Sequence, residues 1–228
     1  MFNRYSITAL PSSLELKFKA KIPVLYHPNF NAAPDQSLPV ILNDRMTEVT
    51  MARWGMDSQL IKTGKSNLLF YTKDINSLKS NETFLQALVK RRCLVLADGF
   101  YLWKFITKKS SVPYRVVAKT EKIFCFCGIW EEFQSNKFCF FILTRNSYKP
   151  VNELSDQMPV VLSPPDELKW LSGNLPKEKV LHEAEIEDWA FFKYYPVSPR
   201  IKDPSINSPS LIQISPSADQ HGNLTLFD

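Results

Sequence analysis

The chain has 228 residues, of which 44% are hydrophobic and 22% charged, and its formal net charge is +5. These proportions are typical of a globular protein and exclude a disordered chain, a coiled coil and a collagen-like repeat. A chain of this length buries roughly 70% of its unfolded surface, so it can fold without disulfides or metal. No apolar run reaches the roughly 18 residues of a membrane span, and the N-terminal segment lacks a secretory signal pattern. We therefore expect a cytoplasmic protein with no membrane partner.

The first half of the chain predicts two helices and a hairpin. Residues 12–21 indicate a short helix, although their alternation also fits a strand. Residues 38–43 and 46–55 predict a β-hairpin with its turn at Asn43. Residues 81–92 predict a helix with one apolar face and basic residues at its C-terminal end, where they interact favourably with the helix dipole.

The second half is mostly β-structure. Four β-rich stretches are separated by polar clusters and predict an antiparallel meander: residues 93–105, 114–119, 122–130 and 137–144. A helix start follows at Ser163 and its two prolines, and another helix is predicted over 177–189. Residues 196–228 are rich in proline and serine, which indicates an irregular strap across the surface.

The four cysteines lie inside apolar runs, where a free cysteine behaves as a small hydrophobic residue: Cys93, Cys125, Cys127 and Cys139. The Cys-x-Cys spacing is shorter than zinc-binding knuckles use. On a strand it places both side chains on one face. We expect packing roles for the thiols, and no metal or cofactor.

Basic charge is concentrated in one part of the chain. Residues 62–122 contain thirteen Lys and Arg but four acidic residues, whereas the remainder has more acids than bases. A local positive potential attracts phosphate groups. The alternative is an ordinary solvated basic face.

Four strings of the sequence, in order, resemble the SOS-response-associated peptidase (SRAP) family of abasic-site processing proteins. They are PNFNAAPDQSLPVI (28–41), RRCLVLADGFYLWK (91–104), ILTRNSYKPVNELSDQMPVVLSP (142–164) and YYPVSPRIKD with INSPSLIQ (194–213). The resemblance implies a single α+β domain over residues 1–228, built on a strongly bent antiparallel β-sheet or barrel-like core with flanking helices. Residues 196–228 then form a strap that packs on this domain.

The resemblance also implies a chemistry whose reactive residues this chain lacks. Family members expose a Cys at position 2, whose amine and thiol condense with the aldehyde of an abasic site. They also use an Asn, a Glu and a His. The corresponding residues here are Phe2, Tyr71, Leu102 and Ser155. None of them supplies the thiol, the carboxylate or the imidazole of that mechanism. We interpret the chain as a pseudoenzyme with no catalytic residues, in which Met1 is retained.

The residue types with which the family contacts DNA are retained more fully in this chain than the reactive residues are. By resemblance, the DNA-binding positions are Arg4, Asn31, Pro34, Trp54, Lys73, Trp103 and Thr144. Aromatic rings stack on unpaired bases, and cations contact the backbone. Each residue also has an ordinary structural reading: the tryptophans as core or barrel-rim residues, Asn31 and Pro34 as turn residues, and Arg4 as a solvated charge. Gln157 replaces an Arg found in many relatives, which counts against DNA binding.

Three functions remain open on sequence alone. The first is a catalytically inactive protein of the DNA damage response that binds single-stranded, junction or abasic-site DNA. The second is a scaffold for a protein partner, with Phe2, Tyr71 and Leu102 filling the former active site. The third is a lyase in which the amine of Met1 or Lys73 forms an imine with the abasic aldehyde, which requires a depressed amine pKa.

Overall fold

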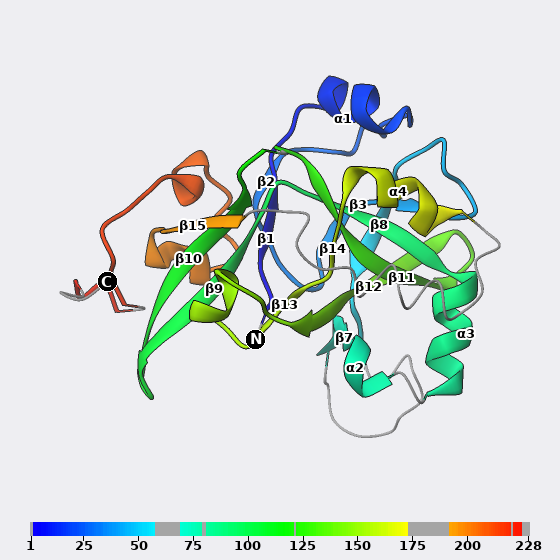
Figure 1. Ribbon diagram of the computed structural model, residues 1–228. Coiled ribbons are helices and arrows are strands. Elements are labelled where there is room, and N and C mark those ends of the chain that lie inside the picture. The colour runs from blue at the N-terminus through cyan, green and yellow to red at the C-terminus, as the bar shows by residue number, and fades with distance from the viewer. Residues whose placement is uncertain are drawn as a thin grey trace.

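The computed structural model describes residues 2–57, 69–78, 81–120, 122–172, 192–219 and 221–224 (Figure 1). The helix predicted over 177–189 and the amine of Met1 lie outside these residues. Within the described ranges, no helix is both long enough and apolar enough to cross a membrane.

The first sheet contains the N-terminal strand and a long hairpin. Its strand order is β15-β10-β9-β1-β2, and every pairing in it is antiparallel. The strands are β1 (Tyr5–Ile7), β2 (Asn29–Ala32), β9 (Gly99–Thr107), β10 (Ser110–Ala118) and β15 (Phe192–Pro196). β1 lies between β2 and β9, so the N-terminal residues enter the middle of the molecule.

The second sheet curls into a closed ring. Its order is β13-β12-β4-β3-β8-β11-β14, and an additional pairing of β12 with β11 joins five of these strands into a barrel. The strands are β3 (Ser37–Leu42), β4 (Thr50–Trp54), β7 (Thr72–Asp74), β8 (Arg92–Ala97), β11 (Phe124–Gln134), β12 (Lys137–Asn146), β13 (Gln157–Pro159) and β14 (Val161–Leu162). Two pairings of β12, with β4 and β7, are parallel. The predicted barrel-like α+β architecture is confirmed, with these parallel pairs as a departure from a purely antiparallel core.

Helices flank the barrel, and the 3-10 turns η2 (Pro199–Lys202) and η3 (Pro209–Ile212) pack on the first sheet. The helices are α1 (Pro11–Phe18), α2 (Ile75–Leu78), α3 (Glu82–Lys90) and α4 (Pro164–Leu171), with a further 3-10 turn, η1 (Val151–Glu153). A small ribbon pairs β5 (Met56–Asp57) with β6 (Leu69–Phe70). The predicted helix, rather than a strand, forms at α1, and it ends where Lys19 adopts a left-handed conformation.

One predicted β-stretch, residues 93–105, is in fact two strands in different sheets. The chain changes sheets at Asp98, between β8 and β9. The Asp98 carboxylate accepts hydrogen bonds from Ser6 Oγ (2.6 Å), from Thr8 Oγ1 (2.7 Å) and from the Arg115 guanidinium (2.9 Å). A buried charge is stable only with such partners, so this residue joins β1, β8 and β10 at the junction of the two sheets.

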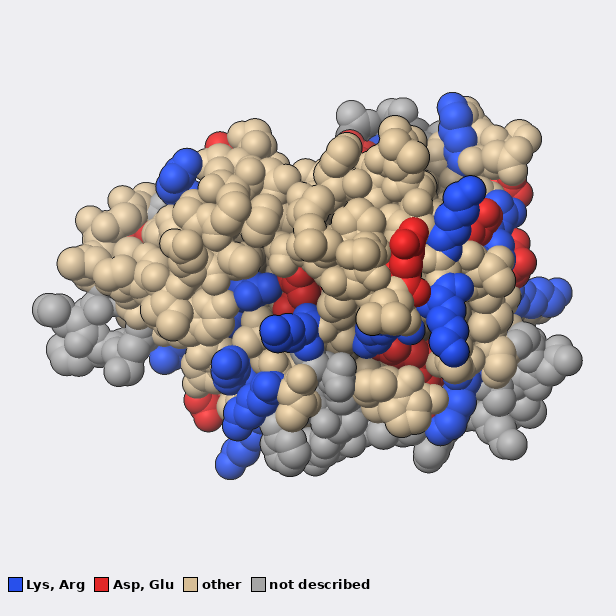
Figure 2. All heavy atoms as spheres, turned by 90° about the horizontal axis from the view of Figure 1, so that it is seen from above, with Lys and Arg blue, Asp and Glu red and all other residues tan. Residues whose placement is uncertain are grey.

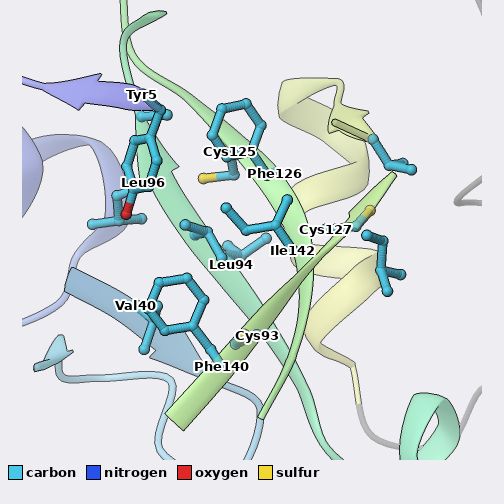
Figure 3. Close-up of a cluster of buried hydrophobic side chains, with 14 of the residues drawn as sticks. Tyr5, Val40, Cys93, Leu94, Leu96, Cys125, Phe126, Cys127, Phe140 and Ile142 are labelled. Carbon is cyan, nitrogen blue, oxygen red and sulfur yellow. The ribbon is translucent and has the colours of Figure 1, made fainter. Parts of the chain in front are cut away.

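The interior of the barrel is apolar and aromatic (Figure 3). Alternating positions of β8, β11 and β12 point inward, as the period of a strand requires. All four cysteines are buried, as the sequence predicts, and Cys125 and Cys127 lie on the opposite face of β11 from the inward-pointing Phe126. Burial raises the pKa of the Cys139 thiol to about 12, and the pKa values of Cys93 and Cys125 also lie above their usual range.

One buried arginine contacts the C-terminal ends of two helices. The Arg92 side chain is fully buried, and it donates to the carbonyl oxygens of Leu88 (3.0 Å) and Val89 near the end of α3. It also donates to Trp170 O (2.5 Å) and Ser172 O (2.5 Å) at the end of α4. The last carbonyls of a helix have no partner within the helix. One guanidinium therefore caps both helices on the barrel.

We predict that Arg92→Met lowers the free energy of unfolding by about 3 kcal/mol, because the hydrogen bonds to the four carbonyls are lost inside the protein. Urea unfolding monitored by circular dichroism measures the change. The exposed Arg200 is a matched control, and Arg200→Met should shift the free energy by less than about 0.5 kcal/mol. Equal effects of the two substitutions would contradict the capping role of Arg92.

Candidate functional site

The candidate site is centred on Phe2, at the position where the sequence resemblance places the reactive residue of the family. Phe2 is only 1% exposed. Its ring centroid lies 5.7 Å from that of Trp54, 6.1 Å from Phe100 and 5.7 Å from Phe126, in tilted or edge-to-face arrangements. Aromatic rings at these separations attract one another beyond the effect of area burial. Phe2 is thus a core residue that joins the first sheet to the barrel.

The other two apolar replacements pack in the same cluster. Leu102 is 1% exposed and belongs to the same apolar core as Phe2. Tyr71 is half-buried against this core, with its ring 5.9 Å from that of Trp54. The Trp54 indole nitrogen donates to the Tyr71 carbonyl oxygen (2.9 Å). Phe2 and Tyr71 thus both contact Trp54, Leu102 is part of the same apolar core, and none of the three supplies a carboxylate or a thiol.

Ser155 lies in a local turn. Its hydroxyl donates to the Gln157 carbonyl oxygen (3.1 Å) and accepts from the Gln157 amide nitrogen (3.3 Å). The Gln157 side-chain amide in turn donates to the Asp74 carboxylate (3.3 Å) on β7. These contacts shape the turn before β13, and they provide no base that could activate the hydroxyl.

Arg4 and Asn31 bind the C-terminal strap. The Arg4 guanidinium donates to the Lys202 carbonyl oxygen (3.2 Å), and the Asn31 amide donates to the carbonyl oxygens of Asp203 (2.8 Å) and Ile206 (3.1 Å). Burial lowers the pKa of the Arg4 guanidinium. Burial also disfavours the charged form of the Tyr71 phenol and so raises its pKa, although the nearby Arg4 charge acts in the opposite direction. Arg4 is therefore a partly desolvated cation rather than a fully solvated one.

The two tryptophans differ in accessibility. Trp54 is 0% exposed, and its ring lies parallel to that of Phe140 with centroids 6.4 Å apart. Trp103 is partly exposed, and it packs against a second apolar cluster made by Tyr101, Val197, Ile201 and Leu211. Trp103 is thus accessible in part, whereas Trp54 is enclosed. Of the remaining predicted DNA contacts, Pro34 is partly exposed and Thr144 is buried.

Lys73 lies apart from Phe2. In the parallel pairing of β7 with β12 it is opposite Leu143, on the face of β12 that carries Phe141 rather than Phe140. Its ammonium lies 5.1 Å from the centre of the Phe141 ring and 5.6 Å from that of Phe70. It lines a cavity of about 700 Å³ beside α3. Burial lowers the pKa of the Lys73 ammonium. Lys73 nevertheless lies on a different face of the sheet from Phe140 and so apart from Phe2 and the rings around it.

The basic stretch does not form one surface in the described part of the chain. Its described members lie on β7, at the end of α3, on the β9–β10 hairpin and after β10, and two of them, Arg92 and Arg115, are buried. Figure 2 shows separate groups of Lys and Arg on the face seen from above, with Asp and Glu among them. Among the residues described, no three His, Cys, Asp or Glu side chains gather into a possible metal site.

Of the three rings around Phe2, the sequence indicated Trp54, as a candidate DNA contact, but not Phe100 or Phe126. Phe100 comes from the first sheet and Phe126 from the barrel. Alternation along each strand could have shown that Phe100 shares a face with Leu102, and Phe124 with Phe126. Nothing in the sequence pattern shows that these two strand faces meet, because that depends on how the two sheets pack.

Comparison with known proteins places this geometry in a family. The family model described as SOS response associated peptidase (SRAP) matches residues 1–204. The chain is similar to the abasic site processing protein YoqW of Bacillus subtilis, with 29% identity over 200 residues that cover 82% of this chain and 87% of YoqW. It is also similar to the abasic site processing protein HMCES of Xenopus tropicalis, with 27% identity covering 81% of this chain and 65% of HMCES.

A solved structure of a protein from Bacteroides thetaiotaomicron has the same fold. It superposes with a TM-score of 0.78 and 19% sequence identity, and the match covers 93% of this chain and 99% of that one. At this identity the likeness concerns the fold alone.

We predict that Phe2→Ala lowers the free energy of unfolding by about 3 to 5 kcal/mol, because it removes a buried ring and leaves a cavity between the two sheets. Chemical unfolding followed by tryptophan fluorescence measures this change, since Trp54 is a neighbour of the lost ring. The exposed Leu10 provides a control, and Leu10→Ala should change the value by less than about 0.5 kcal/mol. A loss below about 1 kcal/mol for Phe2→Ala would show that the ring is not part of the core.

Proposed function

Because the chain belongs to the SOS response associated peptidase (SRAP) family, we propose that it binds abasic-site or single-stranded DNA without forming a covalent bond to it. The names of the relatives, which are abasic site processing proteins, support DNA as the partner. The buried ring of Phe2 supports the absence of covalent chemistry.

The burial of Phe2 is the observation that carries this proposal. A thiazolidine requires an amine and a sulfur on adjacent carbons, and residue 2 has no sulfur. The cysteines cannot substitute for it, because all four are buried. Burial raises the pKa values of Cys93, Cys125 and Cys139. Since the thiolate is the reactive form of a cysteine, these thiols are poor nucleophiles.

The acid–base groups of the implied mechanism are missing as well. Leu102 replaces the Glu and is buried, and the Ser155 hydroxyl is held in its turn by Gln157. Proton transfer requires a titratable group within hydrogen-bond reach of the reacting atoms. Loss of the nucleophile together with the acid–base groups leaves no partial form of that mechanism.

Features that suit non-covalent binding remain on the surface. Arg4 keeps its charge beside the strap, and Trp103 and Pro34 are partly exposed. A ring that stacks on a base contributes about 1 to 3 kcal/mol whatever the base, and cations contribute through the phosphates. Binding therefore does not depend on the groups that chemistry requires.

We predict salt-sensitive binding to a fluorescent single strand of about 20 nucleotides, measured by anisotropy with an abasic site and with an intact base. If about four phosphates are contacted, raising the salt from about 50 to about 200 mM should weaken binding by about 50-fold, since single strands give a slope near −0.7 per contact.

The same titration with a duplex of equal length serves as a control for simple charge attraction. The absence of any anisotropy change with micromolar protein at low salt would reject DNA binding, and would favour a protein partner for this fold.

A further inference from the structure

The β9–β10 hairpin extends from the body of the molecule as a two-stranded ribbon (Figure 1). Its outer part has the sequence KFITKK, residues 104–109, which we call the arm. The arm contains three lysines and no acidic residue. The strands at its base are buried, whereas residues 105–109 are exposed.

Two large apolar side chains in the arm face solvent. Phe105 is 69% exposed and Ile106 is 40% exposed. The pairing shifts between Ser110 and Ser111, so that Ile106 is an extra residue opposite no partner. Such bulges redirect side chains and are common near binding sites. Phe105 thus exposes most of its surface beside the partly exposed Ile106, and contiguous exposed apolar surface marks interaction sites.

Phe105 continues a row of aromatic side chains that begins in the core. Tyr101, Trp103 and Phe105 alternate along β9 and therefore share one face of the ribbon. They are buried, partly exposed and exposed in that order. The Cα atoms of successive members lie about 7 Å apart along the strand. The row leads from the second apolar cluster outward to the tip of the arm.

Positive charge accompanies this row. Lys104 lies with its ammonium 6.0 Å from the ring centre of Tyr114, and Lys108 and Lys109 form the turn. Among the described residues, the Asp219 carboxylate lies near the tip, where its Oδ2 accepts a hydrogen bond from Ser110 Oγ (3.3 Å). Asp219 is nearly buried, and it also accepts hydrogen bonds from the backbone amides of His221 and Asn223. The arm itself therefore carries three lysines and no carboxylate.

Exposed aromatic rings flanked by cations are the combination that binds single-stranded nucleic acid, through base stacking and phosphate contacts. We propose that the arm is a second part of the DNA-binding surface, in which Phe105 stacks on an unpaired base and Lys108 and Lys109 contact phosphates. This inference rests on the proposed function. It extends the binding site beyond the neighbourhood of Phe2 to the tip of the hairpin.

The test measures the affinity of each variant for a long single strand of about 20 nucleotides. Phe105→Ala should weaken binding of the long strand by about tenfold, the loss expected for one stacked base. The double variant Lys108→Ser/Lys109→Ser should weaken it and also reduce the salt slope by about 1.4, for two phosphate contacts. Phe105→Tyr should keep most of the wild-type affinity, because tyrosine retains the aromatic ring.

Two matched controls lie on α1 and just after it, away from the arm in Figure 1. Leu16→Ala removes another exposed apolar side chain, which is 83% exposed, and Lys19→Ser/Lys21→Ser removes two exposed lysines. Neither should change the affinity for the long strand by more than about twofold. Circular dichroism should show the same fold for every variant.

The outcomes separate this inference from the function on which it rests. If the wild type binds the long strand tightly and both arm variants bind it with the same affinity, the proposed role of the arm is wrong, while DNA binding by the protein stands. No binding by the wild type would reject both. Sedimentation could instead show that the wild type is a dimer and that Phe105→Ala is a monomer with unchanged DNA affinity. That result would mean that the arm joins two copies of the chain, and it would likewise overturn the proposal.

Discussion

The ring of Phe2 is buried between the two sheets, and this contact is the constraint on which the site depends. Burying a phenylalanine side chain contributes about 1.5 to 3 kcal/mol, and the contacts with Trp54, Phe100 and Phe126 add to it. A residue that stabilises the core in this way is not free to react with a ligand. In the proposed function, residue 2 therefore contributes packing, and as a phenylalanine it has no sulfur for a thiazolidine.

The C-terminal strap completes the surface next to this cluster. It is held by polar contacts from Arg4 and Asn31 and by an apolar cluster around Tyr101. Because Arg4 donates to a strap carbonyl, its charge is oriented by residues about two hundred positions away in the sequence. In the proposed function, DNA binding is thus linked to folding, since the Arg4 cation and the partly exposed ring of Trp103 both contact the strap.

Local patterns predicted much of the fold. The hairpin of β3 and β4, the helices α3 and α4 and the burial of the cysteines follow from periodicity and capping residues. The division of one β-stretch at Asp98 was missed, because it results from hydrogen bonds to Ser6 and Arg115, far away in sequence. For the site, resemblance identified Phe2 and Leu102 as replacements. It did not show that Trp54 is enclosed or that Lys73 faces the α3 cavity, since both depend on the closure of the barrel.

The central claim is that this protein holds abasic DNA without reacting with it. The most direct measurement incubates a fluorescent single strand carrying one abasic site, beside an intact control, and analyses it on native and denaturing gels with and without borohydride. Borohydride fixes any imine as a stable amine, so a reaction through the Met1 or Lys73 amine would also be detected. The account predicts a shifted band on the native gel and no protein–DNA band on the denaturing gel. A covalent band under either condition would contradict it.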